Sequence, residues 1–331
     1  MANILFFTSI MLLSFYLTEQ TKSSHDNMIA NSDIKTNTLK SVENFGPNSG
    51  EEENIMMLLG TRGVEAATKS KKPYKIRNPR YVIDNQNHKE FDARKRWPQC
   101  KTIGEVYNEG NALLSWAYAT TGVFADRMCI ATNGSYNKHL STEELISCSG
   151  IKASANGWVR DGLAWEYFKT HGLVSGGSIY NTNDGCQPSK IPPVCNLPTK
   201  INKRTCVDYC YGNDTIKYNH DHVKVRYYYH VKPKDIQKEV QTYGPVTAAL
   251  NLYDDIFLHK SGVYTLTKNA KYVRLQYVKL IGWGVENGVD YWLLVNSWGN
   301  EWGQNGLLKI KRGKYGCAVE SFVYAAVPKI K

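Results

Sequence analysis

The order of the secondary-structure signals along this chain most limits the folds it can adopt. In its middle part the signals are helical: apolar side chains recur at three- and four-residue spacing across 114–132, and a Ser-Thr-Glu-Glu capping box starts at Ser141. From residue 223 onward they are those of strands, two of them joined by the hairpin-favouring pair Asn287-Gly288. Helices followed by strands predict an α+β fold with a cleft between its halves.

Composition and the placement of the cysteines separate a leader from a body. The chain has 331 residues, 42% of them hydrophobic, which argues against a disordered or multispan membrane protein. All eight cysteines lie between Cys100 and Cys317. The length is enough for one large domain or two, and the core is expected within the cysteine-containing part.

The first 87 residues have the features of a secretory leader. Leu5 to Leu17 carries no charge, which suits a signal peptide over 1–20; an uncleaved anchor or a buried helix are the alternatives. Residues 21–87 are polar, with a short apolar segment and a basic run, as in a propeptide of a zymogen. We therefore expect an oxidising compartment in which cysteines pair.

The positive charge belongs to the body. Of the net charge of +11, residues 87–331 contribute +10, from 31 basic and 21 acidic side chains. A basic body could bind acidic polysaccharide, whereas no motif points to nucleic acid. Two sequons, at Asn133 and Asn213, fit a glycoprotein.

Several strings, in the same order along the chain, resemble the papain-like cysteine peptidases, and cathepsin B in particular. They are FDARKRWPQC (91–100), HGLVSGG (171–177), YGPV (243–246), KSGVY (260–264), IGWGVENG (281–288) and NSWGNEWGQNG (296–306). The resemblance implies a helical left half and an antiparallel, β-barrel-like right half over residues 88–331, with a shortened occluding loop at about 186–210. It also implies a secreted or lysosomal monomer that needs no cofactor or metal and binds peptides or cystatin-like inhibitors.

The residues at the implied catalytic positions depart from the family pattern. Ser115 takes the place of the cysteine nucleophile, Gln276 that of the histidine base, and Glu109 that of the glutamine that binds the oxyanion; Asn296, which orients the histidine, is kept. A serine hydroxyl ionises far less readily than a thiol, and a carboxamide does not titrate near neutral pH. An ionised Glu109 would repel an oxyanion.

We therefore expect a cathepsin B-like protein without proteolytic activity that acts by binding. The alternatives are weak hydrolysis with Ser115 as nucleophile, and binding of polyanions through the basic surface. None of the eight histidines falls where a substitute base is needed, and His220 with His222 lacks a third ligand for a metal.

The resemblance also places the cleft residues and the disulfides. Gly157, Trp158, Trp298 and Phe322 map to the substrate cleft, where the bulk of Trp158 and Val159 should narrow the space. The implied bridges are Cys100 to Cys129, Cys148 to Cys206, and Cys186 to Cys210. Cys317 matches an unpaired position, and Cys195 is expected to be free or bonded to another molecule.

Overall fold

The computed structural model describes most of the cysteine-containing body. The described residues are 89–110, 113–160, 162–177, 180, 182–190, 204–313 and 317–330. The expected signal peptide, propeptide and Cys195 lie outside them. No helix in these ranges is long and apolar enough to cross a membrane.

One long helix dominates the helical half. The described helices are α3 (Ala93–Arg96), α4 (Ser115–Ala131), α5 (Thr142–Cys148), α6 (Leu163–Thr170), α7 (Tyr218–Asp221) and α8 (Ile236–Tyr243), with 3-10 turns η2 (Lys101–Gly104), η3 (Pro233–Asp235) and η4 (Asp254–Leu258). The N-cap predicted at the start of α5 is present, because the Ser141 hydroxyl accepts a hydrogen bond from the Glu144 amide at 2.9 Å. The predicted capping box is not completed, since the Ser141 N–H donates to the Val174 carbonyl and the Glu144 carboxylate accepts from the Val174 N–H. The helix predicted over 114–132 is α4.

The strands form an open, mainly antiparallel sheet. They are β1 (Phe91–Asp92), β2 (Lys224–His230), β3 (Val246–Tyr253), β4 (Val263–Tyr264), β5 (Tyr272–Glu286), β6 (Val289–Val295), β7 (Leu307–Lys311) and β8 (Phe322–Lys329). Their order is β2-β8-β3-β5-β6-β7-β4, with β1 paired to β5 and only the β4–β7 pairing parallel among these strands. The predicted hairpin joins β5 to β6, and Asn287 and Gly288 both have positive φ, as a two-residue turn requires.

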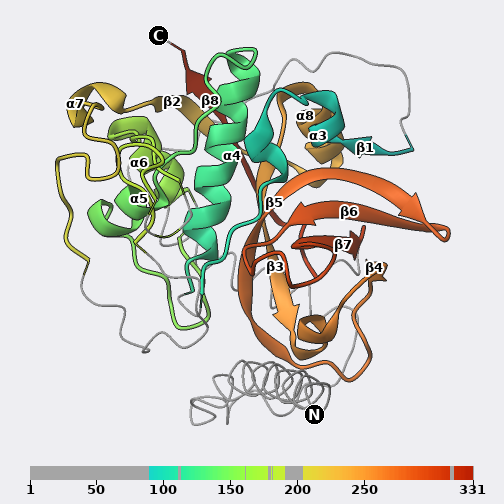
Figure 1. Cartoon of the computed structure of the whole chain (residues 1–331). Coiled ribbons are helices and arrows are strands. Elements are labelled where there is room, and N and C mark those ends of the chain that lie inside the picture. The colour runs from blue at the N-terminus through green and yellow to red at the C-terminus, as the bar shows by residue number, and fades with distance from the viewer. Residues whose placement is uncertain are drawn as a thin grey trace, which may run out of the picture. The chain divides into compact units, whose positions relative to one another are not determined.

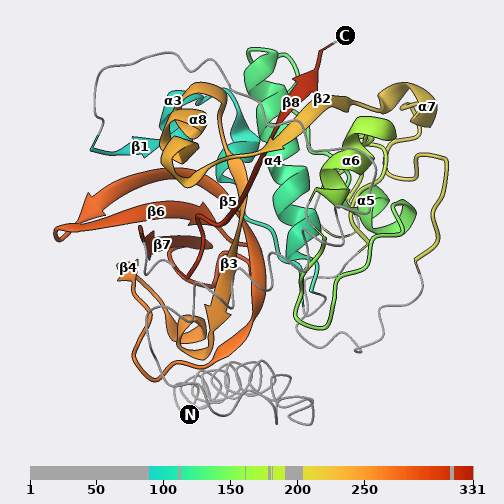
Figure 2. The ribbon, with the colours of Figure 1, turned by 180° about the vertical axis from the view of Figure 1, so that it is seen from behind.

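Helix α4 joins the two halves. Figures 1 and 2 show it between α5 and α6 on one side and the sheet on the other. Its two charged residues are buried but paired: Asp126 contacts Lys279 of β5 at 3.0 Å, and Arg127 contacts Glu239 of α8 at 2.9 Å. These ion pairs fix the helix, and with it Ser115 at its first turn, against the sheet.

Disulfides and a polar network hold the loops of the helical half. The three implied bridges are present, Cys100–Cys129, Cys148–Cys206 and Cys186–Cys210, while Cys317 is buried and belongs to none of them.

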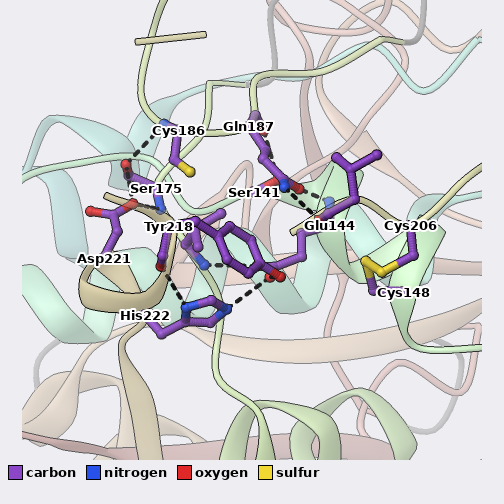
Figure 3. Close-up of polar contacts among 12 residues, drawn as sticks. Ser141, Glu144, Cys148, Ser175, Cys186, Gln187, Cys206, Tyr218, Asp221 and His222 are labelled. Atoms are coloured by element: carbon purple, nitrogen blue, oxygen red, sulfur yellow. Dashed lines mark hydrogen bonds and ion pairs between the residues drawn. A yellow bond between two sulfur atoms is a disulfide. The ribbon is translucent and has the colours of Figure 1, made fainter. Parts of the chain in front are cut away.

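Figure 3 shows how α7 is fastened to α5 and to the segment after α6. Glu144 accepts a hydrogen bond from Tyr218 at 2.8 Å and contacts the His222 ring at 2.9 Å, while Asp221 accepts from the backbone and hydroxyl of Ser175. Burial opposes a charge on His222, but Glu144, the Tyr218 carbonyl and Asp221 together raise its pKa. No three described His, Cys, Asp or Glu side chains are grouped to hold a metal ion.

Candidate active site

Ser115 is the first residue of α4 and is buried. Its side chain is 3% exposed, and its Oγ accepts a hydrogen bond from the backbone N–H of Tyr277 on β5 at 3.2 Å. Leu113 and Leu114 lead into the helix, and Leu113 has a φ of 51°. The position at a helix N-terminus is as predicted, but the hydroxyl is used to attach α4 to β5.

Gln276 lies in the middle of β5 and is buried. Its Nε2 lies 2.8 Å from Glu109 Oε1, 3.0 Å from Asn296 Oδ1 and 3.3 Å from Ser297 Oγ. Ser115 is not among the described partners of this amide. Asn296 therefore does orient the residue at the base position, but that residue has no proton to exchange near neutral pH.

Glu109 spans the space between the halves. It precedes α4, its backbone N–H donates to the Ser297 carbonyl at 2.9 Å, and its Oε1 accepts hydrogen bonds from Gln276, from Ser297 Oγ at 3.1 Å and from Trp298 Nε1 at 3.2 Å. Trp298, expected in the cleft, is thus turned toward this carboxyl group. The contacts tie the chain before α4 to the segment after β6.

The burial of Glu109 affects its pKa. The side chain is fully buried, and this burial raises the pKa of the carboxyl group; the charge of Arg274 and the hydrogen bonds lower it, but less. Glu109 Oε2 and Gln276 Oε1 are both buried without a hydrogen-bond partner among the described residues. Burial therefore shifts the carboxyl group toward its neutral form, and its Oε1 bonds to Gln276, Ser297 and Trp298.

Two further contacts cross the cleft beside Ser115. The Leu275 N–H on β5 donates to the Asn156 carbonyl at 3.0 Å. Gly157 has a φ of 79°, and a Cβ there would lie 2.9 Å from the Leu275 carbonyl oxygen, so the approach requires glycine. The loop at 154–159 and β5 are therefore in direct contact.

The second contact comes from the side chain of Tyr277. Its Oη donates to the Val159 carbonyl at 3.0 Å and accepts from the Val159 N–H at 3.3 Å. A cavity of about 30 Å³ remains beside it, lined by residues of both halves: Trp116, Thr120, Val159, Arg160, Gly162, Leu163, Ala164, Trp165, Thr247, Tyr277, Phe322 and Tyr324. Phe322 lines this cavity, whereas Trp158 is partly exposed and does not.

A larger cavity lies away from these residues. It has a volume of about 600 Å³ and is bounded by β1, α3, α8 and the β5–β6 hairpin. Its lining mixes the aromatic rings of Phe91 and Trp283 with charges of both signs, including Asp92 and Lys95. None of the candidate site residues reaches it.

Comparison with known proteins agrees with this architecture. Residues 87–327 match the family described as papain family cysteine protease. The chain belongs to the papain family.

Other papain-family proteins are similar over most of their length. The chain is 33% identical over 309 residues to "Cathepsin B-like cysteine proteinase 5" of Caenorhabditis elegans, covering 84% of this chain and 88% of the relative. It is also 33% identical to "Cathepsin B-like cysteine proteinase" of Schistosoma japonicum, covering 84% and 83%. Among solved structures, "proCathepsin B S9 from Trypanosoma congolense" aligns with a TM-score of 0.65 and 27% identity, covering 77% of this chain and 84% of that one. The papain-like α+β fold expected from the sequence is confirmed.

Sequence reasoning missed several residues of this papain-family site. Ser297, Asn156 and Tyr277 make contacts that join the two walls, and none of the three was predicted. Val159 was expected in the cleft, but its hydrogen bonds to Tyr277 were not. One signal was visible: Tyr277 directly follows Gln276, at a position where the family pattern has alanine. That a phenol there would reach Val159 depends on packing between segments 118 residues apart in sequence.

Proposed function

We propose that this protein is a proteolytically inactive member of the papain family that acts by binding a peptide or protein partner. The observation that carries the proposal is the environment of Gln276. Its amide is held by Glu109 and Asn296, and no titratable side chain contacts the Ser115 hydroxyl among the described residues. Acyl transfer by the family mechanism requires a thiolate and a titrating base in contact, and both are replaced here.

The expected loss of kcat can be estimated from the effects of substitutions in the catalytic triads of other enzymes. Loss of a nucleophile or a base costs roughly 10⁶-fold in kcat, and loss of one oxyanion donor roughly 10²- to 10³-fold, without additivity. Glu109 does not substitute as a base, because its carboxyl group contacts Gln276, Ser297 and Trp298 rather than Ser115. Hydrolysis with Ser115 as nucleophile is therefore the weaker alternative.

The setting of this binding function is the secretory pathway or the lysosome. Three disulfides in a body of this size fit an oxidising compartment. Asn133 of the first sequon is exposed and available to carry a glycan. The partners we propose are peptides, cystatin-like inhibitors or a propeptide, all of which recognise the papain-like surface without requiring cleavage.

A second candidate, binding of acidic polysaccharide, is favoured by the edge of the sheet. Lys224 of β2 lies opposite Lys329 of β8 in register, a placement of like charges that is unfavourable without a counter-ion. Arg226 is exposed nearby, and neither it nor Lys329 forms an ion pair with another described residue. Heparin retention that falls steeply with salt, and that Arg226→Ala and Lys329→Ala together abolish, would support this candidate.

The proposed function is tested by hydrolysis of a broad peptide-substrate library. The wild-type protein, after removal of residues 1–87 by an added protease, should show no turnover above that of Ser115→Ala. Turnover that Ser115→Ala abolishes and thiol alkylation leaves intact would overturn the proposal in favour of a serine nucleophile.

A further inference from the structure

We infer that Tyr277 is a built-in occupant of the peptide-binding cleft: its hydroxyl takes the place of a ligand backbone along Val159, and its ring fills the adjacent side-chain pocket. The inference rests on the proposed function only in that the ligand is bound rather than cleaved. It predicts that extended peptides with an aromatic side chain are excluded until the Tyr277 side chain leaves.

The first argument concerns the backbone of Val159. A residue in an extended segment presents its N–H and C=O to the same side, where an added antiparallel strand would pair with both. In this structure both groups bond to one atom, Tyr277 Oη, at 3.3 Å and 3.0 Å. A phenolic hydroxyl can do this because it offers one donor hydrogen and lone pairs as acceptors. No backbone hydrogen bond of Val159 is left for a ligand on this side.

The second argument concerns the pocket. Tyr277 packs against the helical-half core that contains Trp116, Val159 and Ala164, and Phe322 lines the same cavity. The space that remains is small, about 30 Å³, against about 600 Å³ for the cavity beside β1 and α3. An apolar side chain of a ligand cannot enter, although the walls of the pocket are suited to one.

The third argument concerns how release could occur. The Tyr277 backbone is fixed, since it pairs with Ala249 of β3 and donates to Ser115 Oγ. Its side chain is only partly buried, so rotation of the side chain, not movement of β5, would open the pocket. Loss of two hydrogen bonds on rotation should weaken ligand binding by roughly ten- to a hundredfold.

The test is the affinity of a labelled, end-capped peptide Gly-Ser-Phe-Ser-Gly, measured by fluorescence anisotropy, with Gly-Ser-Ala-Ser-Gly as the matched peptide. Tyr277→Ala should bind the phenylalanine peptide at least tenfold more tightly than wild type, with a much smaller gain for the alanine peptide. Tyr277→Phe, which keeps the ring and loses the bridge to Val159, should show a several-fold gain. Tyr209→Ala, at an exposed tyrosine, should bind like wild type.

Wild type binding as tightly as folded Tyr277→Ala would overturn the inference. Folding is checked by thermal unfolding, and p-cresol should raise the midpoint of Tyr277→Ala more than toluene does, because only the cresol restores the bridge to Val159. If Tyr277→Ala does not fold, an unchanged affinity of Tyr277→Phe overturns the inference instead. Because the readout is binding, wild-type hydrolysis would defeat the proposed function and leave this comparison intact.

Discussion

Gln276 Nε2 lies 2.8 Å from Glu109 Oε1, so the residue at the base position of the papain pattern and the residue at the oxyanion position are bonded to each other. In an active site of this kind, both would face the substrate. Here the pair joins the segment before α4 to β5, and Glu109 also accepts hydrogen bonds from Ser297 and Trp298. The replaced residues have thus become part of the packing between the two halves.

Protonation of Glu109 should make the protein more stable in acid. Burial raises the pKa of this carboxyl group above its ordinary 4.5, so the folded state binds the proton more tightly than the unfolded state does. The stability that protonation of Glu109 contributes is therefore fully present below pH 4.5, and it is lost as pH rises through the pKa that Glu109 has in the folded state. Arg274 of β5 and Tyr118 of α4 are the other ionisable groups that interact with it.

Glu109→Gln isolates this effect, because the amide can still pair with Gln276. Urea unfolding from pH 4 to 8 should show the variant gaining stability relative to wild type as pH rises. If the difference in unfolding free energy between the two proteins does not change with pH, the raised pKa of Glu109 in the folded state is contradicted.

His139 should contribute stability that disappears in alkali. Hydrogen bonds that the charged ring donates to Asp184 and Glu105 raise its pKa to about 10, against the effect of burial. The contribution is complete below the ordinary pKa of 6.5 and declines as pH rises from 6.5 toward 10. The free energy of unfolding of wild type relative to His139→Gln should fall across this window; a constant difference would mean that the ring is not charged.

Gly157 should tolerate alanine less well than Gly150. Both have positive φ, so both pay about 1–2 kcal/mol for a Cβ, but only at Gly157 does the Cβ meet the Leu275 carbonyl, at 2.9 Å. Overpacking should add roughly 1–3 kcal/mol to Gly157→Ala. Equal losses of unfolding free energy in the two variants would show that the contact across the cleft is not close.

Removal of the buried Asp126 side chain, which pairs with Lys279, should strongly lower the free energy of unfolding. Asp126→Ala leaves Lys279 buried without its ion-pair partner and should cost roughly 3–5 kcal/mol, measured by urea unfolding. The control is Asp290→Ala, whose pair with Arg312 is partly exposed and should be worth under about 1 kcal/mol. Similar losses of unfolding free energy in the two variants would contradict the claim that the Asp126–Lys279 ion pair holds α4 against β5.

Local signals predicted much of the fold and less of the site. The extent of α4, the cap at Ser141 and the Asn287-Gly288 turn depend on neighbouring residues, and these predictions are confirmed. The extent of strand β8 and its place in the sheet were not predicted. Strand β8 pairs with β2 and β3, which are distant from it in sequence, so no local pattern predicts these pairings.

The site shows the same limit. Substitutions at Ser115, Gln276 and Glu109 were visible in the sequence, as was the loss of proton-transfer chemistry. Where the new side chains point depends on burial and on partners far along the chain. For that reason the sequence predicted a cleft narrowed by Trp158 and Val159 but neither the burial that raises the pKa of Glu109 nor the bridge from Tyr277 to Val159.

The most direct test of an inert centre is peptide turnover by four processed proteins: wild type, Ser115→Ala, the revertant Glu109→Gln/Ser115→Cys/Gln276→His, and that revertant with Tyr277→Ala. Wild type and Ser115→Ala should show no turnover, and the revertant with Tyr277→Ala should exceed wild type by at least about 10³-fold. Turnover by wild type that is lost in Ser115→Ala would contradict the account.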